Sequence, residues 1–333
     1  MPLAIGRRHF LASAGACAAG AATGWPLASP AGAAIPKPDR ELMVPVEGGR
    51  IYVRVNGELH GPRLPIVMIH GGPGSSHAGF LNALPLATER GVILYDQLDS
   101  GKSDSPNDPR NWRVERFVDE LDAIRRALGL QRFHILGGSW GGTIALEYAA
   151  RQPAALAATV LQSPLISTQS WLADAAELRG ELPAATQTIL AECDAAKPPS
   201  AATCDAATNQ FYARFLRRVK SSVENTAYGR GLPVPFNSRI YEAMWGHTEF
   251  VSTGTLRNYN GEPLLARLDG KRTLFVCGEY DEARPATLAA FSRRVPGSSF
   301  AVIEDSGHGV FNDNPLAVLE LLRRWLPARD MAA

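Results

Sequence analysis

One serine in this chain has the neighbours that a nucleophile requires. In the stretch HILGGSWGG, residues 134–142, two glycines stand on one side of Ser139 and two more lie just beyond the tryptophan that follows it. The serine ends a run of strand-forming residues and precedes a helix-forming stretch. A sharp turn from a strand into a helix needs small neighbours, and it pushes the hydroxyl into the open. The pattern therefore predicts an attacking alcohol at Ser139.

An attacking serine needs a base, and the base needs a carboxylate to orient it. Of the seven histidines, His308 in EDSGHGVF directly follows the last apolar run, and Asp281 in VCGEYDEARP follows the preceding one. The chain order Ser, Asp, His is that of the α/β-hydrolases. We therefore predict a triad of Ser139, Asp281 and His308. His9, His60 and His134 are interpreted as structural or exposed.

The oxyanion of a tetrahedral intermediate needs hydrogen-bond donors. The backbone N–H of Trp140 follows the nucleophile, and Gly72 in HGGPG, residues 70–74, offers a second N–H with no side chain in the way. His70 is interpreted as a residue that fixes this loop. No grouping of histidine, cysteine and carboxylate residues suggests a metal site, and no cofactor is expected.

These residues must be positioned by a sheet. Continuous apolar runs, typical of fully buried strands, recur along the chain at residues 64–72, 91–97, 132–138, 157–163, 272–281 and 298–308. Helical patterns separate several of them; in residues 114–130 the apolar positions recur at spacings of three and four. Residues 41–46 and 50–55 alternate like a hairpin. We expect a mostly parallel α/β sheet with helices on both faces and antiparallel strands at one edge.

One long stretch lacks this rhythm. Between residues 165 and 263 there is no buried strand, only helix-like pieces broken by KPPS and GLPVPFN. The domain prediction is a core of residues 40–164 and 264–330 with a helical cap, residues 165–263, inserted between two strands. The cap is expected to cover the carboxyl edge of the sheet.

The charge balance of the 333 residues restricts the partners. Lys and Arg number 34 against 33 Asp and Glu, a net charge of +1, and 45% of the residues are hydrophobic. No strong field attracts nucleic acid or an anionic membrane. A soluble domain with a large core is expected.

The pattern of the first 34 residues predicts an export signal. Two adjacent arginines precede a mild apolar run rich in alanine and glycine, and small residues follow near positions 31–34. This resembles a twin-arginine signal, which delivers folded proteins to the Tat export machinery. We expect a periplasmic or secreted protein without stable membrane insertion after processing. A disordered tail and a membrane anchor are the alternatives.

The cysteine content is compatible with the predicted periplasmic or secreted location. Cys17 belongs to the predicted signal, and Cys277 lies in an apolar strand and is expected to be buried. Cys193 and Cys204 lie close together in a polar segment. In an oxidising compartment these two could form a disulfide, and two free thiols are the alternative.

Several motifs together resemble one family. HGGPG, YDQLDSGKSD, GGSWGG, MWGHTEFVSTGTL and GEYDEARP occur in this order, and the likeness extends over nearly everything from residue 40 onward. They resemble the proline iminopeptidases, α/β-hydrolases that include L-amino acid amidases. The resemblance implies the same triad, an oxyanion hole of Gly72 and Trp140, and the cap.

The resemblance also implies how a substrate is chosen. Members of the family hold the free α-amino group with two carboxylates, which here fall at Glu249 and Glu282. An α-nitrogen lies only about 2.5 Å from its own carbonyl carbon, so a carboxylate pair beside the triad selects the first residue of a chain. Two adjacent carboxylates repel each other until a cation arrives, and one tends to take up a proton.

Two residues depart from the family pattern. Asp99 stands where glycine is usual, and His247 stands where proline usually precedes the cap glutamate. These changes concern substrate preference rather than the chemistry. Six cap aromatics are candidates for the side-chain pocket: Trp171, Phe211, Tyr212, Phe236, Tyr241 and Trp245.

The function predicted from these features is a serine hydrolase. It would release an N-terminal amino acid, with proline preferred, from a small peptide or amide through an acyl-enzyme. The alternatives are an L-amino acid amidase, an esterase or lactonase that uses the same triad without strict amine recognition, and a noncatalytic ligand-binding homologue.

Overall fold

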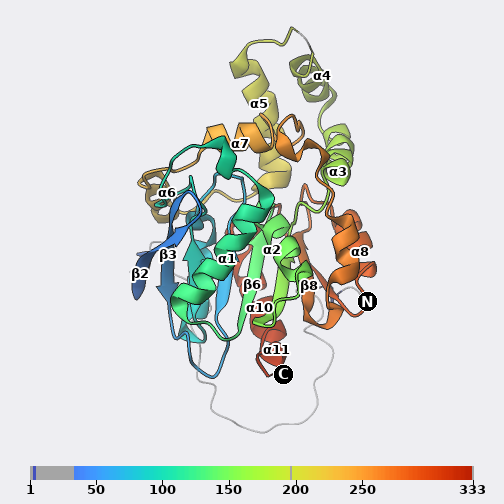
Figure 1. The fold of residues 1–333 in the computed structure, drawn as a ribbon. Coiled ribbons are helices and arrows are strands. Elements are labelled where there is room, and N and C mark those ends of the chain that lie inside the picture. Colours follow the sequence, from blue (N-terminus) through green and yellow to red (C-terminus); the bar gives the residue numbers. More distant parts are fainter. Residues whose placement is uncertain (1–2, 5–33, 196, 332–333) are drawn as a thin grey trace.

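A single sheet runs through the core of the protein (Figure 1). The computed structural model describes residues 3–4, 34–195 and 197–331. Within these ranges the strands stand in the order β1-β9-β8-β7-β6-β4-β5-β3-β2. Their bounds are β1 Leu3–Ala4, β2 Arg40–Val46, β3 Gly49–Asn56, β4 Ile66–Ile69, β5 Val92–Tyr95, β6 Phe133–Gly138, β7 Leu156–Gln162, β8 Thr273–Gly278 and β9 Ser299–Ile303.

The pairing follows the predicted pattern. The strands from β9 through β8, β7, β6 and β4 to β5 are parallel, and β2 and β3 form the antiparallel edge. The two-residue strand β1 pairs with β9. It lies inside the predicted export signal, of which residues 1–2 and 5–33 are outside the described residues.

Helices cover both faces of the sheet because successive strand residues point to opposite sides. Val67 and Ile69 pack into one apolar cluster with α1 and α2, whereas Ile66 and Met68 pack into another with α10 and the 3-10 segment His77–Thr88. The helices are α1 Val114–Leu128, α2 Trp140–Ala150, α3 Thr168–Gly180, α4 Ala184–Cys193, α5 Ala201–Phe211, α6 Val223–Arg230, α7 Ser238–Met244, α8 Pro285–Arg293, α9 Val310–Asp313, α10 Pro315–Trp325 and α11 Pro327–Asp330. The predicted fold class is confirmed.

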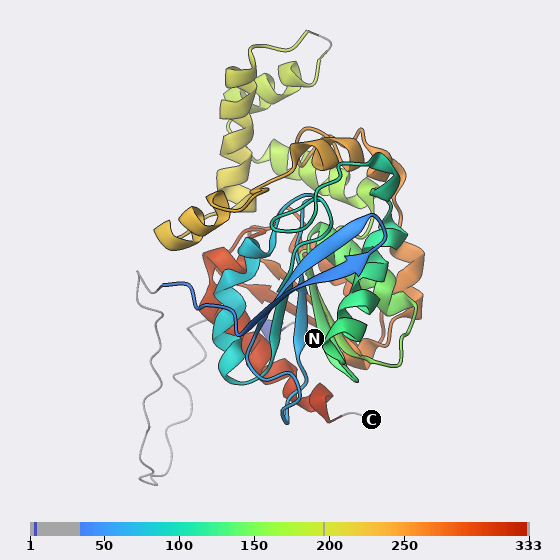
Figure 2. The same ribbon diagram turned by 60° about the vertical axis from the view of Figure 1, so that its left-hand side comes forward.

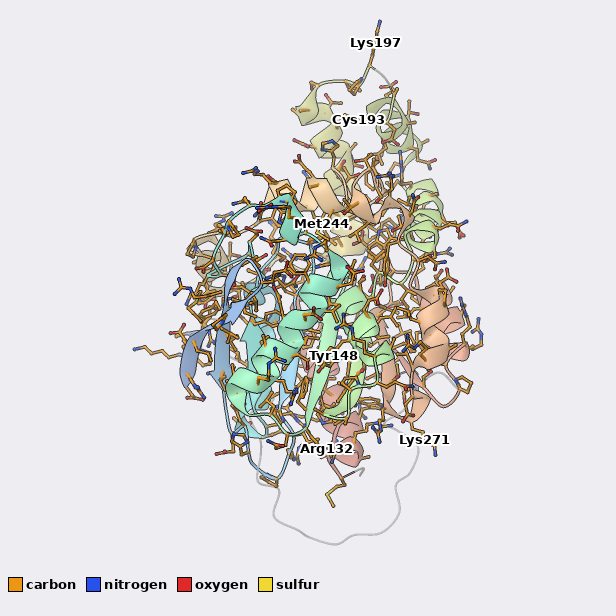
Figure 3. All side chains as sticks on the ribbon, in the orientation of Figure 1. Arg132, Tyr148, Cys193, Lys197, Met244 and Lys271 are labelled. Carbon is orange, nitrogen blue, oxygen red and sulfur yellow. A yellow bond between two sulfur atoms is a disulfide. The ribbon has the colours of Figure 1, made fainter. Side chains whose placement is uncertain are left out.

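Helices α3 to α7 form the cap between β7 and β8. In Figure 2 the yellow α4 and α5 project away from the body as an arm. Cys193 and Cys204 join these two helices through a disulfide, and in Figure 3 Cys193 lies on the arm below Lys197, which is at its tip. The other cysteine of the described region, Cys277, is free and buried, as expected. No helix in the described ranges has the length and apolar character needed to cross a membrane.

Candidate active site

Four neighbouring parallel strands deliver the central residues of the site. Ser139 directly follows β6, Ser163 directly follows β7, and Asp281 and His308 lie in the loops after β8 and β9. Because carboxyl ends of parallel strands share one edge, residues that are up to 169 positions apart converge. The cap lies over this edge (Figure 1).

Ser139 occupies a strained turn. Its φ of 57° and ψ of −123° lie in a region that side-chain-bearing residues rarely adopt. The neighbouring glycines are required by close packing: a Cβ on Gly137 would lie 2.0 Å from the carbonyl oxygen of Gly141, and one on Gly141 would lie 2.1 Å from that of Ile69. The turn is held by the Ser139 N–H, which donates to the Gln162 carbonyl at 3.0 Å. The glycines of the motif therefore exist to let strand, turn and helix approach.

Asp281 is a fully bonded carboxylate. It accepts from His308 Nδ1 at 2.8 Å, from the N–H groups of Gly278 and Ala283 at 3.0 and 2.9 Å, and from the Ser163 hydroxyl. These donors hold the carboxylate in place, and the carboxylate in turn fixes the plane of the imidazole. Ser163 escaped sequence reasoning because nothing in its local sequence marks it.

Neighbouring acids change the pKa of His308. Burial alone would lower its pKa, but the carboxylates of Asp281 and then Glu282 outweigh burial and raise the pKa to about 9. The indole of Trp171 packs edge-on against the ring, with centroids 5.5 Å apart. His308 and Ser139 line the same cavity, and they are not hydrogen-bonded to each other in the described structure. Such bonds often tighten only when substrate is bound.

The two predicted oxyanion donors lie on loops that a buried network holds together. The Trp140 indole donates to the Gln97 side chain at 2.8 Å, whose own amide donates to the His70 carbonyl at 2.7 Å. His70 Nε2 accepts from the Gln97 N–H at 3.0 Å, so its proton is on Nδ1, facing the Gly71 carbonyl. Burial lowers the pKa of His70 to about 4, which keeps the ring neutral. His70 fixes the loop, as predicted.

The glycine loop approaches the nucleophile closely. Gly72 lines the cavity with a φ of +109°, which favours glycine. A Cβ on Gly71 would lie 3.0 Å from Ser139 Cβ and 3.6 Å from Ser139 Oγ. Gly71, which the sequence reasoning passed over, is thus in direct contact with Ser139; its place in HGGPG was the available signal.

The two predicted amine-binding acids lie close to His308 but differ from each other. Glu282 is 1% exposed, neither of its carboxylate oxygens has a hydrogen-bond partner, and Oε1 lies 3.8 Å from His308 Nδ1. Burial, and next the charge of Glu249, raise the pKa of Glu282 well above its usual value. Glu249 lines the cavity and accepts from the Tyr241 hydroxyl at 2.8 Å, and burial raises its pKa.

The cavity above Ser139 has a volume of about 830 Å³. Of the six cap aromatics, Tyr212, Phe236 and Tyr241 line it. The other three do not: Phe211 packs on Phe215 and Phe250 inside the cap, while Trp171 and Trp245 pack on each other. Sequence could not separate the two groups.

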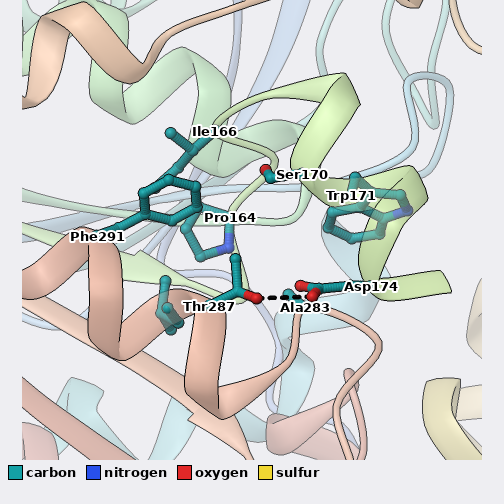
Figure 4. A pocket seen from close by; sticks show the side chains of 9 residues that line it. Pro164, Ile166, Ser170, Trp171, Asp174, Ala283, Thr287 and Phe291 are labelled. Carbon is teal, nitrogen blue, oxygen red and sulfur yellow. Dashed lines mark hydrogen bonds between the residues drawn. The ribbon is translucent and has the colours of Figure 1, made fainter. Parts of the chain in front are cut away.

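A second cavity lies between α3 and α8 (Figure 4). It measures about 10 Å³, room for one water molecule, and Trp171, Pro164 and Phe291 surround it. Across it the Thr287 hydroxyl donates to Asp174 at 2.6 Å. This cavity is a packing contact between cap and core, too small for a substrate.

The two departures from the family pattern have different consequences. Asp99 has a φ of 68°, a conformation that favours glycine, and its carboxylate accepts from the Trp112 indole and the Asn107 N–H. These bonds compensate for the strained backbone and order the loop. His247 is exposed and lines the cavity near Glu249. In the described residues there is no group of three or more potential metal ligands.

Comparisons with known proteins identify the family of this chain. A family profile described as alpha/beta hydrolase fold matches residues 65–315. The proline iminopeptidase of Heyndrickxia coagulans is 36% identical over 287 residues, which is 86% of this chain and 98% of that protein. Among solved structures, VinJ has a TM-score of 0.79 at 32% identity, covering 87% of this chain and 99% of its own. Proline iminopeptidase from Mycobacterium smegmatis has a TM-score of 0.78 at 30% identity, with coverages of 88% and 99%.

Proposed function

This chain belongs to the proline iminopeptidase family of α/β-hydrolases, and from that premise we propose that it releases the N-terminal residue, proline by preference, from small peptides or amides through an acyl-enzyme. Membership makes it a hydrolase of the peptidase type. The reaction steps and the substrate come from the residues of the site.

In the proposed mechanism Ser139 attacks the carbonyl carbon while His308 takes the hydroxyl proton. Asp281 holds the imidazole, and the N–H groups of Trp140 and Gly72 receive the oxyanion. His308 then gives the proton to the leaving nitrogen, and a water molecule, deprotonated by the same imidazole, hydrolyses the acyl-enzyme.

The observation that carries the exopeptidase assignment is that the buried carboxylate of Glu282 has no hydrogen-bond donor. A buried carboxylate without a donor is costly, and it persists where a ligand completes it. Glu282 lies 3.8 Å from His308, and its pKa is raised by burial and next by the charge of Glu249. A substrate ammonium would relieve the repulsion between the two acids and bring the adjacent carbonyl carbon to Ser139.

The test compares each p-nitroanilide with its N-acetylated twin, using proline and alanine as the first residue. We expect kcat/KM for the free amine to be about a hundredfold higher, since an unpaired buried acid costs 2–5 kcal/mol or more. Ser139→Ala should remove the turnover and keep the fold. Equal rates with both twins would instead indicate an esterase or lactonase, and hydrolysis retained by Ser139→Ala would contradict the triad.

We further propose that the protein is exported through the twin-arginine route to the periplasm or beyond. The paired arginines at positions 7 and 8 support this, and so does the Cys193–Cys204 disulfide, since such bonds persist in oxidising compartments. Cell fractionation of the wild type and of a form with both arginines replaced by lysine tests it. Equal export of the two forms would contradict it.

A further inference from the structure

Charged residues of both signs line the main cavity. Glu242 belongs to α7, and Glu249 lies in the loop after it. Arg217 follows the π-helical turn Tyr212–Leu216, and Arg230 ends α6. At about 830 Å³ the cavity is much larger than one amino acid residue. It therefore has room for the leaving part of a substrate as well as for the acyl part.

Arg217 directly follows a cap segment that is hydrogen-bonded to the loop carrying His308. The His308 N–H donates to the Phe215 carbonyl at 2.8 Å, and the Gly309 N–H donates to the Leu216 carbonyl at 2.9 Å. A Cβ on Gly309 would lie 4.0 Å from Arg217 Nε. In the described structure the side chains of Arg217 and Arg230 have no hydrogen-bond or ion-pair partner, so both guanidinium groups are available to a ligand.

The position beside His308 is the leaving-group side of the reaction. His308 must protonate the departing nitrogen, so the departing residue lies next to it. In a dipeptide the α-carboxyl carbon of that residue is only about 2.5 Å from the departing nitrogen. A cation adjoining Gly309 is therefore at the place where the C-terminal carboxylate of a dipeptide falls.

Resting on the function proposed above, we propose that Arg217 binds the α-carboxylate of the leaving residue, so that the preferred substrates are dipeptides with a free C-terminus rather than amino acid amides. Arg230 adds positive charge to the lining of the same cavity. The two ends of a zwitterionic dipeptide then meet opposite charges: its ammonium meets Glu249 and Glu282, and its carboxylate meets Arg217. Guanidinium groups suit this role because they bind carboxylates with two parallel hydrogen bonds.

The neighbouring residue provides a matched control. Arg218 stacks over the Tyr280 ring at 3.8 Å, and its backbone N–H donates to Asp313 at 3.0 Å. It carries the same charge one position away, and it does not line the cavity. A general effect of surface charge would appear equally in variants of both arginines, whereas a carboxylate site would appear in one.

The experiment measures kcat/KM for a dipeptide Xaa-Gly and for its C-terminal amide, with Xaa chosen by the p-nitroanilide panel. We expect the wild type to favour the free acid about tenfold, which is the usual worth of a charge-assisted hydrogen bond. Arg217→Ala should bring the ratio to about one, mostly through KM, and Arg217→Glu should invert it. Arg218→Ala should keep the wild-type ratio.

Two outcomes overturn the inference: a wild-type ratio near one, or an unchanged ratio in Arg217→Ala. If the p-nitroanilides with a free amine are still cleaved in a Ser139-dependent way, only the carboxylate inference fails. If they are not cleaved, the proposed function fails and takes the inference with it.

Discussion

Asp281 and Glu282 are adjacent in one loop, yet they occupy opposite electrostatic situations. Asp281, on the core side, accepts four hydrogen bonds. Glu282, on the side facing Glu249, accepts none, although it is just as deeply buried. Asp281 has all its donors within the protein, whereas Glu282 has no hydrogen-bond donor and only His308, 3.8 Å away, as an ion-pair neighbour. In the proposed function, this difference separates the acid that orients the histidine from the acid that receives the substrate.

Among these variants, Asp281→Asn is expected to have the largest effect on activity. An amide can present an N–H group to His308 and leave the imidazole in the wrong tautomer, so we expect kcat to fall about 10⁴-fold. The variant should also unfold at lower temperature, since three other donors lose part of their acceptor. Steady-state kinetics and calorimetry measure both effects.

Glu279→Gln, an exposed change in the same loop, is the control for Asp281→Asn and should leave both quantities near wild type. If the two variants had similar kcat values, Asp281 would not be the orienting acid.

Glu282→Gln should separate function from stability. For substrates with a free amine we expect kcat/KM to fall about a hundredfold, while rates with N-acetylated substrates change little. The free energy of unfolding should rise in the variant, because a buried carboxyl group that has no hydrogen-bond donor and is repelled by Glu249 is removed. A loss of the same size with both kinds of substrate would make Glu282 a structural residue only.

The pH dependence of that stability difference has a definite sign. The pKa of Glu282 is raised in the folded protein above its usual 4.5, so the protonated acid favours folding below that value, and this contribution is lost as pH rises through the folded pKa. Wild type and Glu282→Gln should therefore be closest in stability at and below about pH 4.5. Above it the variant should gain at most about 1.4 kcal/mol per pH unit relative to wild type. Denaturant unfolding at several pH values measures the difference.

The smallest effect on activity is expected from the cap arm. Replacing Cys193 and Cys204 by serine opens a link between residues 11 positions apart, so we expect faster proteolysis around residue 197. No residue of α4 lines the cavity, so kcat/KM should stay within about twofold of wild type. A larger loss would mean that α5 transmits strain to His308 through the Phe215 carbonyl.

The sequence was sufficient to predict the three residues of the proposed triad. Glycine spacing around Ser139 and the positions of Asp281 and His308 after apolar runs were sufficient, since parallel strands must bring their carboxyl ends to one edge. It gave no indication of Ser163 or Gln97, whose contacts cross between loops. Nor could it choose among the cap aromatics, because neighbouring helices decide which face of a short helix meets the cavity.

What the sequence determined by itself was the order of strands and helices, the strained serine turn and the identity of the charged groups. Those follow from local periodicity and from steric limits that act between near neighbours. Only the tertiary structure decided which carboxylate would accept hydrogen bonds and which would have no donor, and that Arg217 would lie next to Gly309. Burial and partner choice depend on segments that are distant in the sequence, such as those of Ser163 and Asp281, which are 118 positions apart, and their packing sets the environment of these side chains.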